Sequence, residues 1–164
     1  MEKPQRKNNR LLNYDYSQNG AYFITVCTKD KQHIFGKIVG ARIARPNECT
    51  VKIKLSETGK IVNDGINNIE AIYKTICVDK YVIMPNHIHM ILVVNNGRAM
   101  RAPTISTVIN QLKGYITKQT GYSIWQKLFH DHIIRNEQDY LNIWEYIDTN
   151  PHKWQLDKYY SQEN

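Results

Sequence analysis

The sequence has no long apolar run, no paired cysteines and no excess of acidic residues. A helix that spans a bilayer needs about 20 apolar residues in succession, and the longest apolar stretch here is the short segment around Met90–Val94. No apolar segment of signal-peptide length follows the basic N-terminus. The three cysteines are odd in number and widely spaced, so they predict neither a disulfide framework nor a metal pair. We therefore expect a cytoplasmic protein with reduced thiols and no membrane-spanning segment.

What the sequence does contain suits one globular domain with an anionic partner. The chain has 164 residues, 41% of them hydrophobic, which is enough for a sizeable core. Charged residues make up 23% and mix both signs, which argues against wholesale disorder. The net charge of +7 favours a polyanion, either nucleic acid or an acidic membrane surface. We treat residues 1–164 as a single domain.

Hydrophobic periodicity and turn residues divide the chain into alternating strands and helices. Ser56, Thr104 and Asn136 each precede a helical pattern and can cap it, and Pro151 stops the last helix. The expected elements are a basic arm over 1–20, a strand over 21–29, a hairpin or inserted strand pair over 37–55, a helix over 56–73, a strand pair over 75–94, a helix over 104–121, a short strand or turn within 125–134, a helix over 136–150 and a tail over 151–164.

This mixture of elements predicts an α+β protein. Strands and helices alternate within one small chain, and no linker or internal repeat divides it. An antiparallel sheet with the helices packed on one face is the natural architecture.

The segment His87-Ile88-His89 is a candidate metal site. Residues at i and i+2 of a strand point to the same face, so both imidazoles would project together and could grip one divalent ion. A His-x-His pattern has low specificity on its own. His130-Asp131-His132 repeats it in a mixed segment, where a structural or DNA-facing role fits better. A histidine-triad nucleotide hydrolase is rejected, because Ile91 occupies the position of its third histidine.

The helix expected over 136–150 carries the candidate nucleophile, Tyr146. At 100° per residue Tyr146 lies away from an apolar stripe that we expect to face the core, and it shares a face with polar groups. Asn150 follows one turn later on that face and could supply a third metal ligand, although a simple helix C-cap is an equally good interpretation. A metal would polarise a phosphate for attack by the phenol. The apolar stripe consists of Tyr140, Leu141, Trp144 and Ile147.

Together these segments resemble a known family. YVIMPNHIHMILVV is similar to the His-hydrophobic-His segment of the HUH transposases, and most of all to that of the REP-associated tyrosine transposases, relatives of the single-tyrosine insertion-sequence transposases. The stretch WQKLFHDHIIRNEQDYLNIWEYIDTNPHKWQLDKYY resembles their ending, and NYDYSQNGAYFITVCT resembles their opening strand. The likeness covers nearly the whole chain except about residues 37–55.

The resemblance implies a fold, a chemistry and a set of residues. It implies the ferredoxin-like HUH endonuclease fold, a divalent ion (Mg²⁺ or Mn²⁺) and cleavage and rejoining of single-stranded DNA near hairpins through a 5′-phosphotyrosine. In this sequence His87 and His89 match the metal ligands, Asn150 the third ligand and Tyr146 the nucleophile. Tyr115, on the preceding helix, is the backup nucleophile. Phosphate contacts are expected from the group Arg6, Lys7, Arg10, Lys113, Lys118, Lys127 and Arg135.

Three hypotheses about function follow. The favoured one is a metal-dependent tyrosine transposase that acts on single-stranded or hairpin DNA as a monomer or homodimer. A second is a hairpin-DNA-binding protein that keeps the fold without catalysis. A third is a metal-dependent phosphodiesterase that uses water, which would stay active in a Tyr146→Phe variant. Whether Tyr146 serves its own metal site or that of a partner subunit is open at this point, and residues 37–55 have no assigned role.

Overall fold

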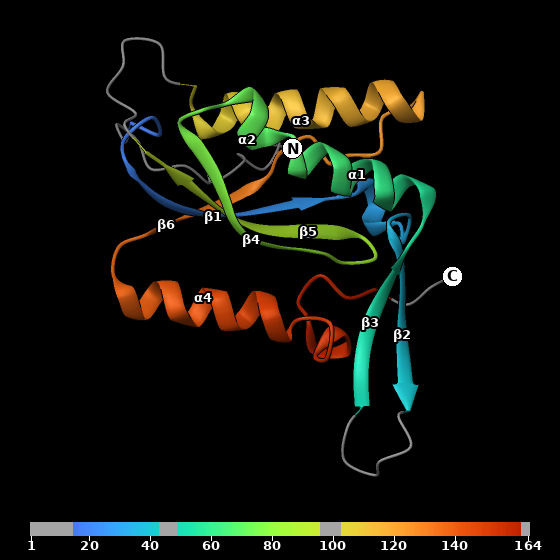
Figure 1. Ribbon diagram of the computed structural model, residues 1–164. Helices are drawn as coiled ribbons and strands as arrows, with labels where there is room; N and C mark the ends of the chain where they lie inside the picture. Colours follow the sequence, from blue (N-terminus) through green and yellow to red (C-terminus); the bar gives the residue numbers. More distant parts are fainter. Residues whose placement is uncertain (1–14, 43–48, 96–102, 162–164) are drawn as a thin grey trace, which may run out of the picture.

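A computed structural model describes residues 15–42, 49–95 and 103–161, and it contains strands, helices and two short 3₁₀ turns (Figure 1). In chain order the elements are β1 (Gly20–Cys27), the turn η1 (Lys29–Lys31), β2 (Gly36–Arg42), β3 (Cys49–Leu55), α1 (Glu57–Asn67), α2 (Ile69–Ile72), β4 (Ile76–Ile83), β5 (His87–Val94), α3 (Ile105–Thr120), β6 (His130–Ile134), α4 (Glu137–Thr149) and the turn η2 (Trp154–Leu156).

The central sheet has four strands in the order β4-β5-β1-β6, and every neighbouring pair is antiparallel. The helices that connect these strands give the β-α-β-β-α-β succession of a ferredoxin-like fold. The predicted α+β class with an antiparallel sheet is therefore confirmed.

The helices begin where the sequence places a capping residue. The side-chain oxygens of Ser56, Thr104 and Asn136 accept hydrogen bonds from backbone N–H groups three residues later, at 3.0, 3.2 and 2.9 Å. Gly121 ends α3 in the left-handed conformation at φ 80°. A break at Asn68 divides the helix expected over 56–73 into α1 and α2.

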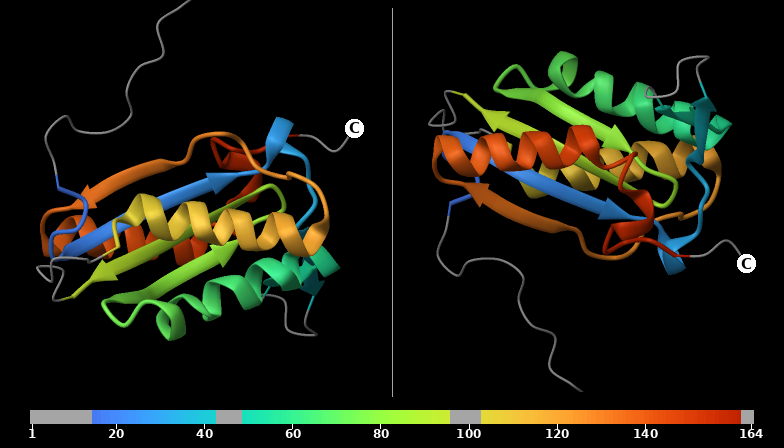
Figure 2. Two further views of the ribbon diagram at one scale, coloured as in Figure 1. Left: turned by 90° about the horizontal axis from the view of Figure 1, so that it is seen from above. Right: turned by 90° about the horizontal axis from the view of Figure 1, so that it is seen from below.

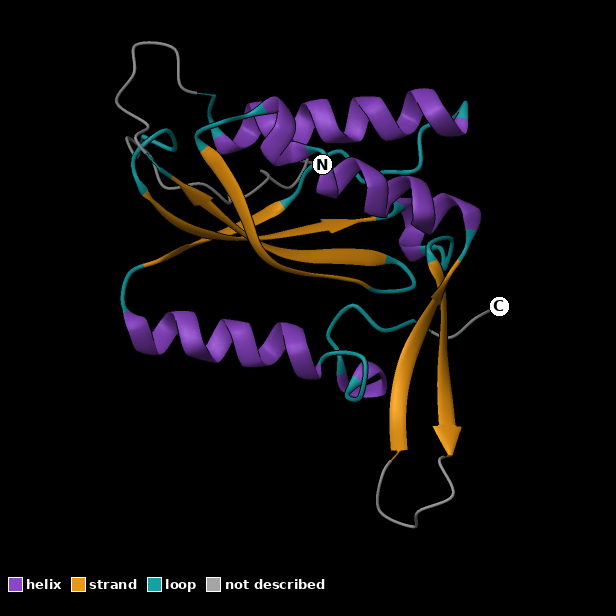
Figure 3. Ribbon diagram, in the orientation of Figure 1, coloured by secondary structure: helices purple, strands orange, loops and turns teal. Residues whose placement is uncertain are grey.

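The helices cover both faces of the sheet, and not one face as expected from the sequence. α1, α2 and α3 lie over one face, and α4 lies across the other (Figures 1 and 3). The contacts agree, since α1 and α2 pack on β4 and α1 packs on α3, while α4 packs on β4 and β5. The sheet is thus the middle layer of three.

The hydrophobic core fills the layer between the sheet and α1–α3. Alternate residues of the two central strands point into it and are buried, because a strand exposes successive side chains to opposite faces. The strand members are Tyr22, Ile24, Val26, Ile88, Met90 and Leu92, and they meet Val62, Ile66, Val108, Ile109, Leu112 and Ile116 of the helices.

The apolar stripe predicted for α4 does not face the core as expected. Leu141 is 51% exposed and Trp144 is 39% exposed, whereas Ile147 is buried. The ammonium of Lys80 lies 3.4 Å from the centre of the Trp144 ring and 2.6 Å from Oδ1 of Asp148. α4 instead turns its mixed face, with Tyr146 and Asn150, toward the sheet.

Residues 37–55 form the predicted strand pair around the segment 43–48, which lies outside the described residues. β2 and β3 pair in a separate two-stranded sheet that projects from the body beside the α4 layer (Figure 1). Lys37, Lys52 and Lys54 are exposed on one side of this ribbon, and Ile38 and Ile53 are half-buried on the other. None of the described helices is long and apolar enough to cross a membrane.

Candidate active site

β5 presents two buried histidines on the face of the sheet that α4 covers. Both His87 and His89 have no exposed surface. Nδ1 of His87 lies 2.7 Å from the amide oxygen of Asn86, and Nδ1 of His89 lies 2.8 Å from the hydroxyl of Thr25. Since the amide oxygen of Asn86 can only accept, Nδ1 of His87 carries the proton and its Nε2 lone pair is available to a ligand.

α4 brings Tyr146 and Asn150 to these histidines within the same chain. The phenol oxygen of Tyr146 lies 3.2 Å from Nε2 of His89. Asn150, one turn later, is 2% exposed, and its side-chain oxygen has no hydrogen-bond partner among the described residues. Of the two residues that the sequence placed on one face of this helix, Tyr146 contacts His89, and Asn150 lies beside the group and donates to Asp157.

A carboxylate that the sequence did not single out completes the group. Asp157 follows the turn η2, and its side chain is fully buried. Its Oδ2 lies 4.0 Å from Nε2 of His87 and 3.9 Å from Nε2 of His89. The same oxygen accepts hydrogen bonds from the Tyr146 hydroxyl, at 2.9 Å, and from the Asn150 amide.

Burial and mutual proximity shift the protonation of the whole group. Burial lowers the pKa of both histidines, and the neighbouring His89 lowers that of His87 further. Burial would raise the pKa of the Asp157 carboxyl, but His89 and the hydrogen bond from Asn150 hold it well below its usual range. Burial and the Asp157 carboxylate raise the pKa of Tyr146. At neutral pH the group therefore holds neutral imidazoles, a carboxylate and a protonated phenol.

The donor set suits a divalent ion. Nitrogen and oxygen atoms of His87, His89 and Asp157 all lie within 4.8 Å of one another. Nε2 of His87 and Oδ1 of Asn150 are buried and lack hydrogen-bond partners among the described residues, which is costly unless a ligand satisfies them. Imidazole and carboxylate together accept Mn²⁺ and related ions.

Aromatic rings surround the group on several sides. The Phe23 ring lies 5.2 Å from His89 and 6.0 Å from Tyr146, measured between ring centres. The Tyr159 ring lies 4.8 Å from His87 and 5.6 Å from His89. The segment 154–161 is fastened over the site, because the amide of Asn86 donates to the carbonyl of Tyr159 at 3.0 Å.

The residues expected to contact phosphates are scattered. Lys118 is exposed on α3, across the sheet from Tyr146. Lys127, shortly before β6 in the chain, and Arg135, directly after it, are also exposed. The Lys113 ammonium donates to the carbonyl of Gln126 at 2.6 Å, and burial lowers its pKa. Arg6, Lys7 and Arg10 lie outside the described residues. Contact with DNA stays a prediction for all seven.

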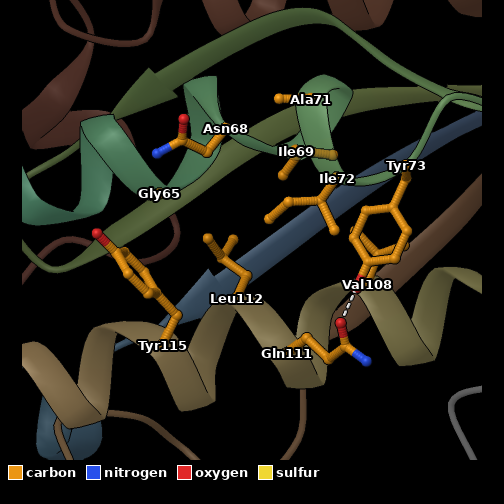
Figure 4. A pocket seen from close by; sticks show the side chains of 10 residues that line it. All are labelled: Gly65, Asn68, Ile69, Ala71, Ile72, Tyr73, Val108, Gln111, Leu112 and Tyr115. Carbon is orange, nitrogen blue, oxygen red and sulfur yellow. Dashed lines mark hydrogen bonds between the residues drawn. The ribbon is translucent and has the colours of Figure 1, made fainter.

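The backup nucleophile lies elsewhere. Tyr115 lines an apolar hollow of about 280 Å³ between α2 and α3, beside Ile69, Ile72 and Leu112 (Figure 4). This hollow is on the opposite side of the sheet from His87 and His89. The structure therefore brings Tyr146, and not Tyr115, to the candidate metal centre.

Comparison with known proteins identifies relatives along the full chain. An uncharacterized protein of Haemophilus influenzae is 31% identical over 177 aligned positions, which cover 94% of this chain and 93% of that protein. A second H. influenzae protein, itself assigned as a REP-associated tyrosine transposase, is 24% identical over 87% of this chain and 77% of its own. The REP-associated tyrosine transposase of Escherichia coli is 32% identical over 80 residues, about half of each chain.

The chain is similar to REP-associated tyrosine transposases, the name that two of these relatives carry. A solved structure described as a REP-associated tyrosine transposase bound to a REP hairpin has the same fold, with a TM-score of 0.65. It is 20% identical, and the match covers 91% of this chain and 76% of that one. No model of a known protein family matches the sequence. The family resemblance inferred from the sequence is thereby confirmed.

Proposed function

We propose that this protein is a metal-dependent transposase that cleaves and rejoins single-stranded DNA near hairpins, with Tyr146 as the nucleophile. The observation that carries the proposal is the 3.2 Å separation between the Tyr146 hydroxyl and Nε2 of His89, inside a buried group with His87 and Asp157. The solved relative with the same fold was bound to a REP hairpin. Hairpin DNA is therefore the partner that we propose for this chain.

The residues present can perform a balanced transfer of the DNA phosphate. The Tyr146 oxygen attacks the phosphorus and forms a P–O bond, while the bond from phosphorus to the 3′ oxygen breaks. The phenol proton passes to solvent water, because the Asp157 carboxylate that accepts its hydrogen bond has a low pKa and faces the two histidines. The leaving 3′ oxygen takes a proton from water. A 5′-phosphotyrosine and a free 3′-hydroxyl result, and the reverse attack rejoins the strand.

The high pKa of Tyr146 explains why this chemistry needs assistance. A half-buried phenol beside a carboxylate is a poor nucleophile when it is protonated. His87, His89, Asp157 and the side-chain oxygen of Asn150 would hold a divalent ion, which supplies Lewis-acid polarisation of the phosphate when bound. We propose Mg²⁺ or Mn²⁺.

We further propose that each chain uses its own tyrosine. Two exposed pairs fasten α4 to the adjacent strand β4: the Tyr140 hydroxyl donates to Asp79 at 2.6 Å, and the Lys80 ammonium donates to Asp148 at 2.6 Å. Both contacts lie within one chain, so Tyr146 reaches the metal centre without a second subunit. A monomer is then sufficient for cleavage.

The test is a covalent-capture experiment. The full chain is incubated with Mn²⁺ and labelled single-stranded hairpin DNA, and the products are separated under denaturing conditions. We expect a protein–DNA adduct for the wild type and for Tyr115→Phe, and none for Tyr146→Phe. Adducts that persist in Tyr146→Phe would refute the assignment. DNA binding without any cleavage favours the binding-protein alternative, and cleavage by Tyr146→Phe without an adduct favours hydrolysis by water.

A further inference from the structure

A cavity beside the candidate metal centre has no assigned role. α4 packs on β4 and β5. Seen from below, α4 leaves β6 uncovered (Figure 2, right). Over β1 and β6 the structure contains a depression of about 480 Å³, which we call the side cavity. This volume lies in the range of small-molecule sites. Its walls include Phe23, Lys31, His130, His132, Lys158 and Tyr159.

The side cavity and the metal centre share walls. Phe23 contacts both His89 and Tyr146, and Thr25, whose hydroxyl bonds Nδ1 of His89, also lines the cavity. The Tyr159 ring lies 5.6 Å from His89 and 6.3 Å from His130, so it borders both spaces. The side cavity and the metal centre are therefore adjacent spaces on the same face of the sheet.

The charge of the side cavity suits a phosphate. Lys31 and Lys158 are the two lysines in its lining, and neither forms an ion pair with any described residue. Asp131 also lines it, but side chains alternate along β6, so its carboxylate projects away from the face that bears His130 and His132. Aromatic rings next to cations are the usual surface for single-stranded nucleic acid, because bases stack on the rings while the cations contact the backbone.

The position of Tyr146 selects which nucleotide the cavity would hold. In a phosphoryl transfer the entering and leaving oxygens lie roughly in line on opposite sides of phosphorus. Tyr146 extends from α4, which packs on β4 and β5, to His89 on β5, so the in-line position for the leaving 3′ oxygen is on the far side, toward β1 and β6. We infer that the side cavity binds the single-stranded nucleotide that leaves with the free 3′-hydroxyl, its base against the aromatic wall and its phosphate at Lys31 and Lys158. This inference rests on the proposed function.

The first experiment tests binding without chemistry. In a Tyr146→Phe background, the affinity for a fluorescent oligothymidylate is measured against salt concentration for Lys31→Gln/Lys158→Gln. The matched control is Lys60→Gln/Lys74→Gln, which removes equal charge from exposed positions on the α1–α2 side. We expect about a tenfold loss of affinity and a salt slope smaller by about 1.4 for the cavity variant. Equal losses in both variants would overturn the assignment.

The second experiment locates the nucleotide. Wild-type adducts identify the cleaved phosphate, and 5-iododeoxyuridine is then placed immediately upstream or downstream of it for photo-crosslinking to Tyr146→Phe. We expect the upstream position to crosslink at His130 or Tyr159. Crosslinks there from the downstream nucleotide alone would overturn the inference. Failure of the proposed function is distinguishable, because the wild type would then form no adduct while the binding experiment still decides whether the cavity holds DNA.

Discussion

The hydroxyl of Tyr146 donates a hydrogen bond of 2.9 Å to Oδ2 of Asp157, eleven residues further along the chain. Because the same carboxylate oxygen faces both histidines, one buried anion links the proposed nucleophile to the proposed metal ligands. At neutral pH the charge of the site therefore comes from Asp157, since both imidazoles are neutral.

Replacing this carboxylate should weaken metal binding. In Asp157→Asn the amide carries no charge, so we expect the affinity for Mn²⁺, measured by titration calorimetry, to fall at least about tenfold. The control is Asp148→Asn, which removes the same charge from an exposed position on α4. Equal affinities for the wild type and Asp157→Asn would contradict a role for this carboxylate in holding the ion.

Two glycines in helices should respond oppositely to alanine. A Cβ at Gly59 would lie 1.9 Å from the carbonyl oxygen of Phe35, because α1 starts directly against that backbone. We expect Gly59→Ala to destabilise the protein by about 1–3 kcal/mol despite the better helix propensity of alanine. At Gly114 nothing lies within 4 Å, and alanine should stabilise by about 0.5–1 kcal/mol. Urea unfolding measures both, and changes of the same sign would refute the close approach.

The hydrogen bond from Tyr140 to Asp79 should make a contribution to the free energy of unfolding that depends on pH. The hydrogen bond to Asp79 raises the pKa of Tyr140 to about 12. The neutral phenol thus stabilises the fold below its unfolded pKa of about 10, and this contribution is lost as pH rises toward 12. Because the pair is largely exposed, we expect Tyr140→Phe to cost only about 0.5–1 kcal/mol at pH 8.

The measurement for this hydrogen bond is the free energy of unfolding of the wild type and Tyr140→Phe as a function of pH. The difference between the two should shrink between pH 10 and 12. Tyr122→Phe serves as the control, because Tyr122 is 58% exposed on the other side of the sheet. A difference that stays constant across this range would rule out the hydrogen bond as its source.

Cys27 should be unreactive in the folded protein. Burial raises the pKa of its thiol to about 11, so only about one molecule in a thousand carries the thiolate at pH 8. In a Cys49→Ser/Cys77→Ser background, Ellman's reagent should label Cys27 only after denaturation. Rapid stoichiometric labelling of the native protein would show that the thiol is accessible.

Local sequence features predicted most of the fold. The caps at Ser56, Thr104 and Asn136 depend on bonds within a few residues, and the strand alternation around His87 and His89 depends only on backbone geometry. These features can be inferred without knowledge of distant contacts. They are why the elements and the histidine pair agree with the structure.

Two features of the site depend on long-range packing and could not be predicted. Asp157 lies in an irregular tail that is held over the site by contacts with β5 and its neighbours. No periodic pattern in the sequence marks this residue. The orientation of α4 was also missed, because the sheet face beneath it carries the polar His87, His89 and Thr25 beside apolar side chains. A helix on such a face buries Asn150 and half-buries Tyr146, and it leaves Leu141 and Trp144 exposed.

The alternation along β5 also protects the site against misfolding. A slip of this strand by one residue would drive both imidazoles into the hydrocarbon layer under α3 and turn Ile88 and Met90 toward α4. Unpaired imidazoles in that layer carry a desolvation penalty, so the shifted pairing is disfavoured. The shift would also separate both histidines from Tyr146. The native pairing, with both histidines on the face that α4 covers, is therefore favoured over the shifted one.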